Sequence, residues 1–294
     1  MHVESILVRG DGAALGPRLA SVASGTALNV LVLMSLGADH AALLSAVSDC
    51  GIKCPIFLTE TYGIIGFDEE LSRNVELMEK GRGSEYGFRG GSGGQGCLIV
   101  AYSGGASAGH TASFPRPEDV SSLMVVADTS KAFAKVAGDA PLHYGGITKE
   151  AFVLTEGGAL EKVPYFWVAS PAGDEPIGVS TFTDDAAGAT SALLGRLPAG
   201  WRPNAVGLFP CFTRGVNLYG EEDVESSAVA GAGLPASTRV YGMFAHGELG
   251  PSSFSGFVRG ASEAMVEHKQ HSMTSILAIH TEPGSGTAPA KEEV

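Results

Sequence analysis

The sequence predicts an α/β fold in which short strands alternate with helices. Apolar runs of strand length are separated by segments whose apolar residues recur at helical spacing. Glycine accounts for 41 of the 294 residues, about double the usual share of roughly 7%. It shows no fixed period, which indicates many tight strand ends and loops. The 44% hydrophobic content allows a large core, and one domain per roughly 150 residues predicts two domains or one duplicated domain.

The N-terminal part is expected to form strands joined by helices. Strands are predicted at residues 5–8, 29–34 and 55–59 because apolar and β-branched residues cluster there. A helical segment is expected at residues 17–23. A longer helix is expected at residues 39–50, with its apolar residues on one face.

The same alternation continues toward the C-terminus. The polar, glycine-rich residues 81–96 predict a surface loop. Further strands are expected at residues 97–102, 122–127 and 141–144, further helices at 130–136 and 184–197, and a hairpin from 152–155 and 163–169. Asp184 is the expected cap of the second of these helices. The expected domains are residues 1–150 and 151–281, followed by a disordered tail at residues 282–294.

Two stretches share a pattern that suggests an internal duplication. Residues 29–66 and 204–250 both read as strand, helix, strand, and each ends in two glycines three residues apart. The glycine pairs are Gly63 with Gly66 and Gly247 with Gly250. Ile64 would then occupy the position of Glu248, so a duplication predicts a polar site in the C-terminal copy only. Chance similarity between two units of this type explains the pattern equally well.

Charge and hydropathy argue against nucleic-acid and membrane partners. The 32 acidic residues outnumber the 19 basic ones, and the net charge of −13 repels phosphate backbones. No apolar run reaches the ~18 residues of a membrane span, and the first residues do not resemble a secretory signal. The four cysteines are too few and scattered for a disulfide framework. A reducing compartment, cytoplasmic, nuclear or both, is therefore expected.

The candidate ligand-binding residues lie at the ends of two apolar runs, where open α/β folds place their ligand sites. They are Cys211, Arg214, Gly215, His246, Gly247 and Glu248. In one interpretation Arg214 binds a carboxylate and Glu248 binds an amine, so an amino-acid-like ligand satisfies both. In the other, Arg214 and Glu248 form a structural ion pair and the glycines only reverse the chain. The sequence leaves these two interpretations equal.

The sequence gives less support for a catalytic site or a metal site. Cys211 as nucleophile with His246 as base is one possibility, but a cysteine after an apolar strand is usually buried and inert. Cys50 and Cys54 lack a second pair of ligands for zinc. No catalytic residue and no metal are therefore expected.

Two glycine patterns imitate dinucleotide sites. Residues 91–96 have the fingerprint spacing but lead into a predicted strand and not a helix. Residues 10–16 follow a strand and precede a helix, yet no acidic residue closes the next strand. No cofactor is therefore expected. The acidic run at residues 221–225 is expected to be a solvated helix start.

The C-terminal motifs resemble those of the FIST-domain family. The matching segments are residues 211–215, the acidic stretch after them, residues 247–250 and the closing run 271–280. Residues 58–67 and 142–147 resemble the N-terminal FIST domain more weakly. The resemblance implies two related FIST-like halves and a non-catalytic recognition module. It places Arg214, Gly215, Gly247, Glu248 and Gly250 at family motif positions.

The resemblance implies two possible roles. One branch of the family carries an F-box and serves as substrate receptor of an SCF-type ubiquitin ligase, which implies protein substrates destined for the proteasome. FIST domains in general look like sensors of small amino-acid-like ligands in signal transduction. The ubiquitin role is placed first. Skp1 and a cullin are possible partners, but no F-box motif is found in this chain: either it is a FIST-only protein, or it is a fragment whose adaptor-binding part lies elsewhere.

Overall fold

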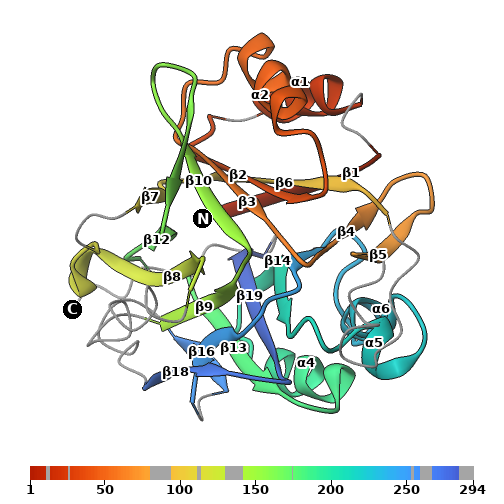
Figure 1. The fold of residues 1–294 in the computed structure, drawn as a ribbon. Coiled ribbons are helices and arrows are strands. Elements are labelled where there is room, and N and C mark those ends of the chain that lie inside the picture. The colour runs from red at the N-terminus through yellow and green to blue at the C-terminus, as the bar shows by residue number, and fades with distance from the viewer. Residues whose placement is uncertain are drawn as a thin grey trace.

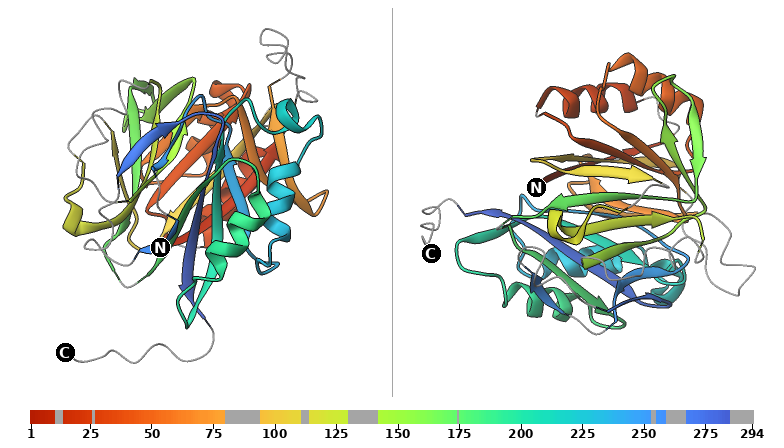
Figure 2. Two further views of the ribbon diagram at one scale, coloured as in Figure 1. Left: turned by 90° about the horizontal axis from the view of Figure 1, so that it is seen from below. Right: turned by 90° about the vertical axis from the view of Figure 1, so that its left-hand side faces the viewer.

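The computed structural model describes residues 1–10, 14–25, 27–79, 94–110, 114–129, 142–173, 175–252, 255–258 and 267–284. Three mixed β-sheets dominate these residues (Figure 1). Helices cover the outer faces of two of the sheets (Figure 2). The molecule is therefore mixed α/β, but the predicted alternation of strands with helices holds only for parts of the chain.

The first sheet contains the N-terminal strands. Its order is β1 (His2–Arg9), β6 (Gly96–Ser103), β2 (Val30–Leu36), β3 (Ile56–Glu60), β10 (Glu150–Leu154) and β11 (Leu160–Val163). Strands β2 and β3 are parallel, and every other neighbouring pair is antiparallel. A parallel pair needs a crossover, and α2 (His40–Asp49) provides it. Asp39 caps this helix by accepting a hydrogen bond from Ala41 N at 2.8 Å.

The other two sheets repeat this order of pairings. The second sheet consists of β7 (Ser107–His110), β12 (Tyr165–Pro171), β8 (Val120–Ala127), β9 (Leu142–Ile147), β16 (Glu248–Pro251) and β18 (His268–His271). The third consists of β13 (Ile177–Phe182), β19 (Ser275–Pro283), β14 (Trp201–Pro210), β15 (Arg239–Met243), β4 (Gly63–Asp68) and β5 (Arg73–Met78), with β17 (Gly256–Val258) added beside β13. In both, the third and fourth strands of this order form the parallel pair.

The strands thus fall into three units that exchange hairpins in a ring. Each unit supplies the first four strands of one sheet, and its hairpin completes a different sheet. The hairpin β4–β5 joins the third sheet, β10–β11 joins the first, and β16–β18 joins the second. Strands from both sides of residue 150 share all three sheets, so the predicted boundary there does not divide the structure. The two stretches with the duplicated pattern lie at equivalent places in the first and third units.

Tyrosines from the three sheets meet in the central core. Tyr102, Tyr144 and Tyr241 belong to the first, second and third sheets, and each is fully buried. His280 on β19 joins two of them: its Nε2 lies 2.8 Å from the Tyr241 hydroxyl and 3.3 Å from the Tyr144 hydroxyl. Burial lowers the pKa of His280 to about 3, so the imidazole is neutral in this cluster.

The outer faces differ between the sheets. Helices α1 (Leu15–Gly25) and α2 cover the first sheet, and α4 (Ala186–Leu194) and α6 (Val224–Gly231) cover the third. Over the second sheet, the described residues contribute the short 3-10 helix η2 (Pro117–Asp119) and Phe114, which stacks on Tyr165 at 5.5 Å. Within the described ranges no helix is long and apolar enough to cross a membrane.

Most predicted elements lie where the structure has an element of the same type. The strands predicted at 5–8, 29–34, 55–59, 97–102 and 122–127 and the helices predicted at 17–23 and 39–50 are confirmed. The strand predicted at 141–144 corresponds to β9. The helix at 130–136, most of the loop at 81–96 and most of the tail lie outside the described residues.

Three predicted boundaries are wrong. Strand β10 pairs with β11, whereas most of residues 163–169 form β12 in another sheet, because Pro164 interrupts the run. Helix α4 begins at Ala186, since Asp185 and not Asp184 caps it, accepting from Gly188 N at 2.7 Å. Strand β19 continues to Pro283 and so includes the first residues of the predicted tail.

Candidate functional site

Arg214, the predicted ligand-binding arginine, is buried among protein groups. Its Nε lies 2.7 Å from Glu225 Oε1, its Nη1 lies 3.0 Å from the Met273 carbonyl oxygen, and its Nη2 lies 2.7 Å from the Tyr219 hydroxyl. The side chains of Arg214 and Glu225 are 3% and 1% exposed. Arg214 therefore pairs with Glu225 and not with Glu248. Because every guanidinium nitrogen already has a protein partner, the geometry favours the structural interpretation of this arginine.

The prediction that the acidic run is a solvated helix start is wrong for Asp223 and Glu225, which are buried. Helix α6 begins at Val224, and Glu225 in its first turn also accepts a hydrogen bond from Ser275 Oγ at 2.9 Å. The Asp223 carboxylate accepts from Glu76 N at 2.6 Å and pairs with Arg73. Hairpin β4–β5 from the first unit packs beside α6 and covers these acids. An exchange between distant parts of the chain leaves no local signal in the sequence.

Cys211 and Glu248 lie together beneath the surface. The Thr213 hydroxyl donates to Cys211 Sγ at 3.1 Å, and Thr274 donates to Glu248 Oε2 from its hydroxyl at 2.8 Å and its backbone N at 3.2 Å. Burial, with the charge of nearby Glu248, raises the pKa of the Cys211 thiol, which opposes formation of a nucleophilic thiolate. Burial likewise raises the pKa of Glu248 to about 7, against the hydrogen bonds from Thr274.

Both predicted glycines sit where a side chain would collide. A Cβ at Gly215, whose φ is +58°, would lie 2.9 Å from Met78 Sδ and from two carbons of the Phe244 ring. Gly247 has a φ of +150°, and a Cβ there would lie 2.5 Å from the amide nitrogen of Gln270, at the end of an exposed side chain. Close packing at Gly215 and backbone conformation at Gly247 therefore account for these glycines without a ligand.

An open cleft lies elsewhere, at the carboxyl ends of β2 and β3, and we call it the Glu60 cleft. It has a volume of about 640 Å³ and is lined by Arg9, Gly10, Leu36, Gly37, Glu60, Leu77, Glu79, Gly94, Gln95 and Lys149. Its walls combine the ends of strands in the first sheet with the end of hairpin β4–β5 and the residue before β10. This is the place where open α/β sheets bind ligands, and the volume is within the range of small-molecule sites.

Two carboxylates and one ammonium group dominate this cleft. Lys149 Nζ lies 3.1 Å from Glu79 Oε2 and 3.9 Å from Glu60 Oε1. Glu60 also accepts from Gly37 N at 3.0 Å, and its Oε2 lies 3.4 Å from His40 Nε2. Burial opposes ionisation of Glu60, but the bonds from His40 and Gly37 and the charge of Lys149 hold its pKa below the usual value. The hydrogen bond to Glu60 raises the pKa of His40.

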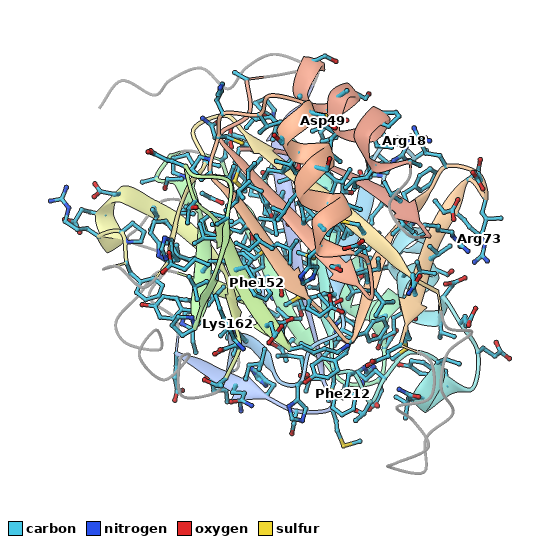
Figure 3. All side chains as sticks on the ribbon, turned by 45° about the horizontal axis from the view of Figure 1, so that its top comes forward. Arg18, Asp49, Arg73, Phe152, Lys162 and Phe212 are labelled. Carbon is cyan, nitrogen blue, oxygen red and sulfur yellow. The ribbon has the colours of Figure 1, made fainter. Side chains whose placement is uncertain are left out.

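An aromatic group adjoins the Glu60 cleft and connects it with the predicted site. Lys149 Nζ lies 5.4 Å from the centre of the Tyr62 ring. Tyr62 packs against Phe212 at 5.4 Å and His246 at 5.8 Å, and these two rings are 5.2 Å apart. Phe212 lies at the rim of the molecule (Figure 3). Tyr62, Lys149 and His246 each precede the hairpin of one unit, so equivalent positions of the three units meet here.

The sequence reasoning missed Glu60, Glu79 and Lys149. A signal existed, because Glu60 closes a predicted strand as Arg214 follows another, but the duplication argument directed attention to the C-terminal copy. One glycine of the two patterns, Gly10, lines the cleft, and its backbone N donates to Gln95 O at 2.8 Å. Two carboxylates here would repel a pyrophosphate, so the cleft does not suit a dinucleotide.

No protein-family model matches this chain, and no curated protein matches its sequence. The likeness to FIST domains therefore depends on the motifs at residues 211–215, 247–250 and 271–280 themselves.

Proposed function

We propose that this protein is a non-catalytic recognition module that binds a small, amino-acid-like ligand through its amino group in the Glu60 cleft. The observation that supports this proposal is the position of Lys149 Nζ, 3.1 Å from Glu79 and 3.9 Å from Glu60. An ammonium group is already stabilised between these carboxylates. A ligand ammonium approaching the same pair would gain charge-assisted hydrogen bonds of the strong class.

The burial of the cleft residues favours ligand recognition over a solvent-exposed ion pair. The side chains of Glu60 and Lys149 are each 18% exposed, so their interactions are weakly screened but still accessible. The network of His40, Gly37 and Lys149 holds the Glu60 carboxylate in place, which limits the entropy lost when a ligand binds. This role agrees with the sensor function implied by the FIST resemblance.

A thermal-shift titration tests the proposal. Alaninamide, alanine and the N-acetylated amide serve as probes, and we expect stabilisation by compounds with a free amino group. Glu60→Gln and Glu79→Gln should abolish the shift. Glu161→Gln on β11, an exposed acid of the same sheet, is the matched control. The proposal would be refuted if a probe stabilised all three glutamine variants equally. It would also be refuted if no probe stabilised the wild type.

A second candidate function is recognition of protein substrates for ubiquitin-dependent degradation, as in F-box only protein 22, which the C-terminal motifs resemble. One observation favours it. Leu218 and Met273 are 48% and 58% exposed, and both lie on segments fixed by Arg214: it donates to the Met273 carbonyl and to Tyr219, the neighbour of Leu218. Exposed apolar side chains on a rigid support are suited to contact a protein.

Affinity purification under proteasome inhibition tests this second function. A double substitution, Leu218→Asp with Met273→Asp, should release partner proteins that the wild type retains. Leu71→Asp is the control because Leu71 is equally exposed, at 48%, but lies on the β4–β5 turn. Recovery of Skp1 and a cullin with the wild type would support a ligase role; an identical set of partners from wild type and double variant would exclude this surface.

A further inference from the structure

We infer that the natural ligand of the Glu60 cleft is the free N-terminus of a polypeptide, bound by its α-ammonium group between Glu60 and Glu79. This inference rests on the proposed function of the cleft and identifies its class of partner. It depends on three features of the described residues: the balance of charge, the size of the cleft and the chemistry of its walls.

The charge balance favours a ligand with a net positive charge. Glu60 and Glu79 supply two negative charges to the cleft, and Lys149 supplies one positive charge between them; His40, 3.4 Å from Glu60, adds a further positive charge only when it is protonated. Arg9 also lines the cleft, but its guanidinium is paired with Asp68, which is 5% exposed and lies outside the lining. A free amino acid carries a carboxylate beside its ammonium and would bring that charge against the two glutamates. A chain N-terminus carries the ammonium and a neutral amide.

The size and walls of the cleft suit a short stretch of main chain. A volume of about 640 Å³ leaves room for more than one amino-acid-like group, as sites for drug-sized ligands do. Gly10, Gly37 and Gly94 contribute bare backbone to the walls, and a Cβ at Gly10 would meet no heavy atom within 4 Å. Bare backbone at strand ends lets a peptide main chain approach closely.

The aromatic group at the edge of the cleft offers a place for the first side chains. Lys149 lines the cleft and its ammonium faces the Tyr62 ring at 5.4 Å, so the cleft and the group of Tyr62, Phe212 and His246 are contiguous. Rings of this kind present an apolar surface with a polar edge, as recognition sites for protein segments commonly do. A peptide bound by its N-terminus would extend out of the cleft across this aromatic surface.

Fluorescence competition with peptides tests the inference. The probes are tripeptide amides that differ in their first residue and end in Gly-Gly-amide, each with a free and an acetylated N-terminus. We expect at least one free tripeptide to bind at least tenfold more tightly than its acetylated form and than alaninamide. Glu60→Gln and Glu79→Gln should each weaken binding at least tenfold, whereas Glu161→Gln should leave it unchanged.

A variant with the opposite expected sign makes the test sharper. Lys149→Met removes the resident positive charge, so a peptide N-terminus should bind more tightly to it than to the wild type. Weaker binding of these amides, which have no carboxylate, to Lys149→Met would show that the lysine supports binding and does not compete with the ligand ammonium, and it would overturn the inference. Alaninamide binding as tightly as every tripeptide would also overturn it while leaving the proposed function intact. No binding by amines or peptides would refute both.

Discussion

The Glu60 cleft lies at an end of the first unit, and the Arg214 cluster, in which Arg214 contacts Glu225, Met273 and Tyr219, lies at the equivalent end of the third unit. The end with the Glu60 cleft is open and polar, whereas the end with the Arg214 cluster is filled. Leu31 pairs with Ile56 in the first unit as Val206 pairs with Val240 in the third. In this alignment, which also keeps the core-facing residues in phase, Gly37 corresponds to Phe212 and Glu60 corresponds to Phe244. The two phenylalanines of the third unit thus occupy the region that the glycine and the glutamate leave open in the first unit.

This difference shows how a repeated backbone acquires a single site. The strands and crossover connections give both ends the same backbone arrangement. A few side chains then determine whether the space between the strand ends is filled or open. In the third unit, Arg214 is used to hold together helix α6, the turn before β19 and α5 (Val216–Tyr219). In the first unit, the charged groups at the equivalent end are partly exposed. Charge at a strand end is therefore structural in one unit and available to a ligand in the other.

The largest effect expected is on stability, from Arg214→Ala. Glu225 would be left buried at 1% exposure without its arginine, which costs about 3–5 kcal/mol of unfolding free energy. Denaturant unfolding measures this. Arg73→Ala removes a partner that is 53% exposed from Asp223, which keeps the hydrogen bond from Glu76 N, and should cost less than Arg214→Ala. If Arg214→Ala unfolded like the wild type and lost ligand binding instead, the assignment of the two sites would be reversed.

The next effect concerns glycines at the two ends. Gly215→Ala places a methyl group 2.9 Å from Phe244 and Met78, so we expect a loss of about 2–3 kcal/mol from overpacking and backbone strain. Gly10→Ala in the open cleft meets no atom within 4 Å, although its φ is +85°, and it should cost only about 1 kcal/mol. Equal losses in thermal or denaturant unfolding would show that the cleft end is as tightly packed as the filled end.

The fold was predictable from the sequence as far as local patterns reach. Apolar runs located most strands, and Asp39 located the start of α2, because these signals lie within a few residues. The exchange of hairpins was not predictable, since β4 joins β15 across nearly 180 positions and no local pattern records that choice. The same limit applies to the sites: Arg214 pairs with Glu225 in helix α6 and not with Glu248, and the sequence alone does not determine which of the two acids the fold brings to the arginine.

The pH dependence of stability should have opposite signs at the two ends. Burial raises the pKa of Glu248 to about 7, so the folded state holds a proton that the unfolded state releases near pH 4.5, and this stabilisation is lost as pH rises through 7. Glu248→Gln should therefore gain about 2 kcal/mol relative to the wild type between pH 5 and 8.

Glu60 provides the opposite case. Its pKa is held below the usual value in spite of burial, so its contribution is present above the ordinary glutamate pKa and is lost as pH falls. Glu60→Gln should be less stable than the wild type at pH 7 and approach it toward pH 3. Urea unfolding of both variants across this range measures the two curves, and parallel curves would contradict the electrostatic difference between the ends.

The smallest effect expected is a change in ligand binding through His40, which has no counterpart at the filled end. Protonated His40 places a positive charge beside Glu60, 3.4 Å away, and Glu60, Glu150 and Asp39 all raise its pKa whereas burial lowers it. A ligand ammonium must compete with that charge, so binding to the cleft should weaken severalfold from pH 7.5 to pH 6. His40→Asn should remove most of this dependence at a stability cost under about 1 kcal/mol, because the pair is partly exposed. If the pH dependence persisted in His40→Asn, another group would have to cause it, and His40 would lose its assigned role.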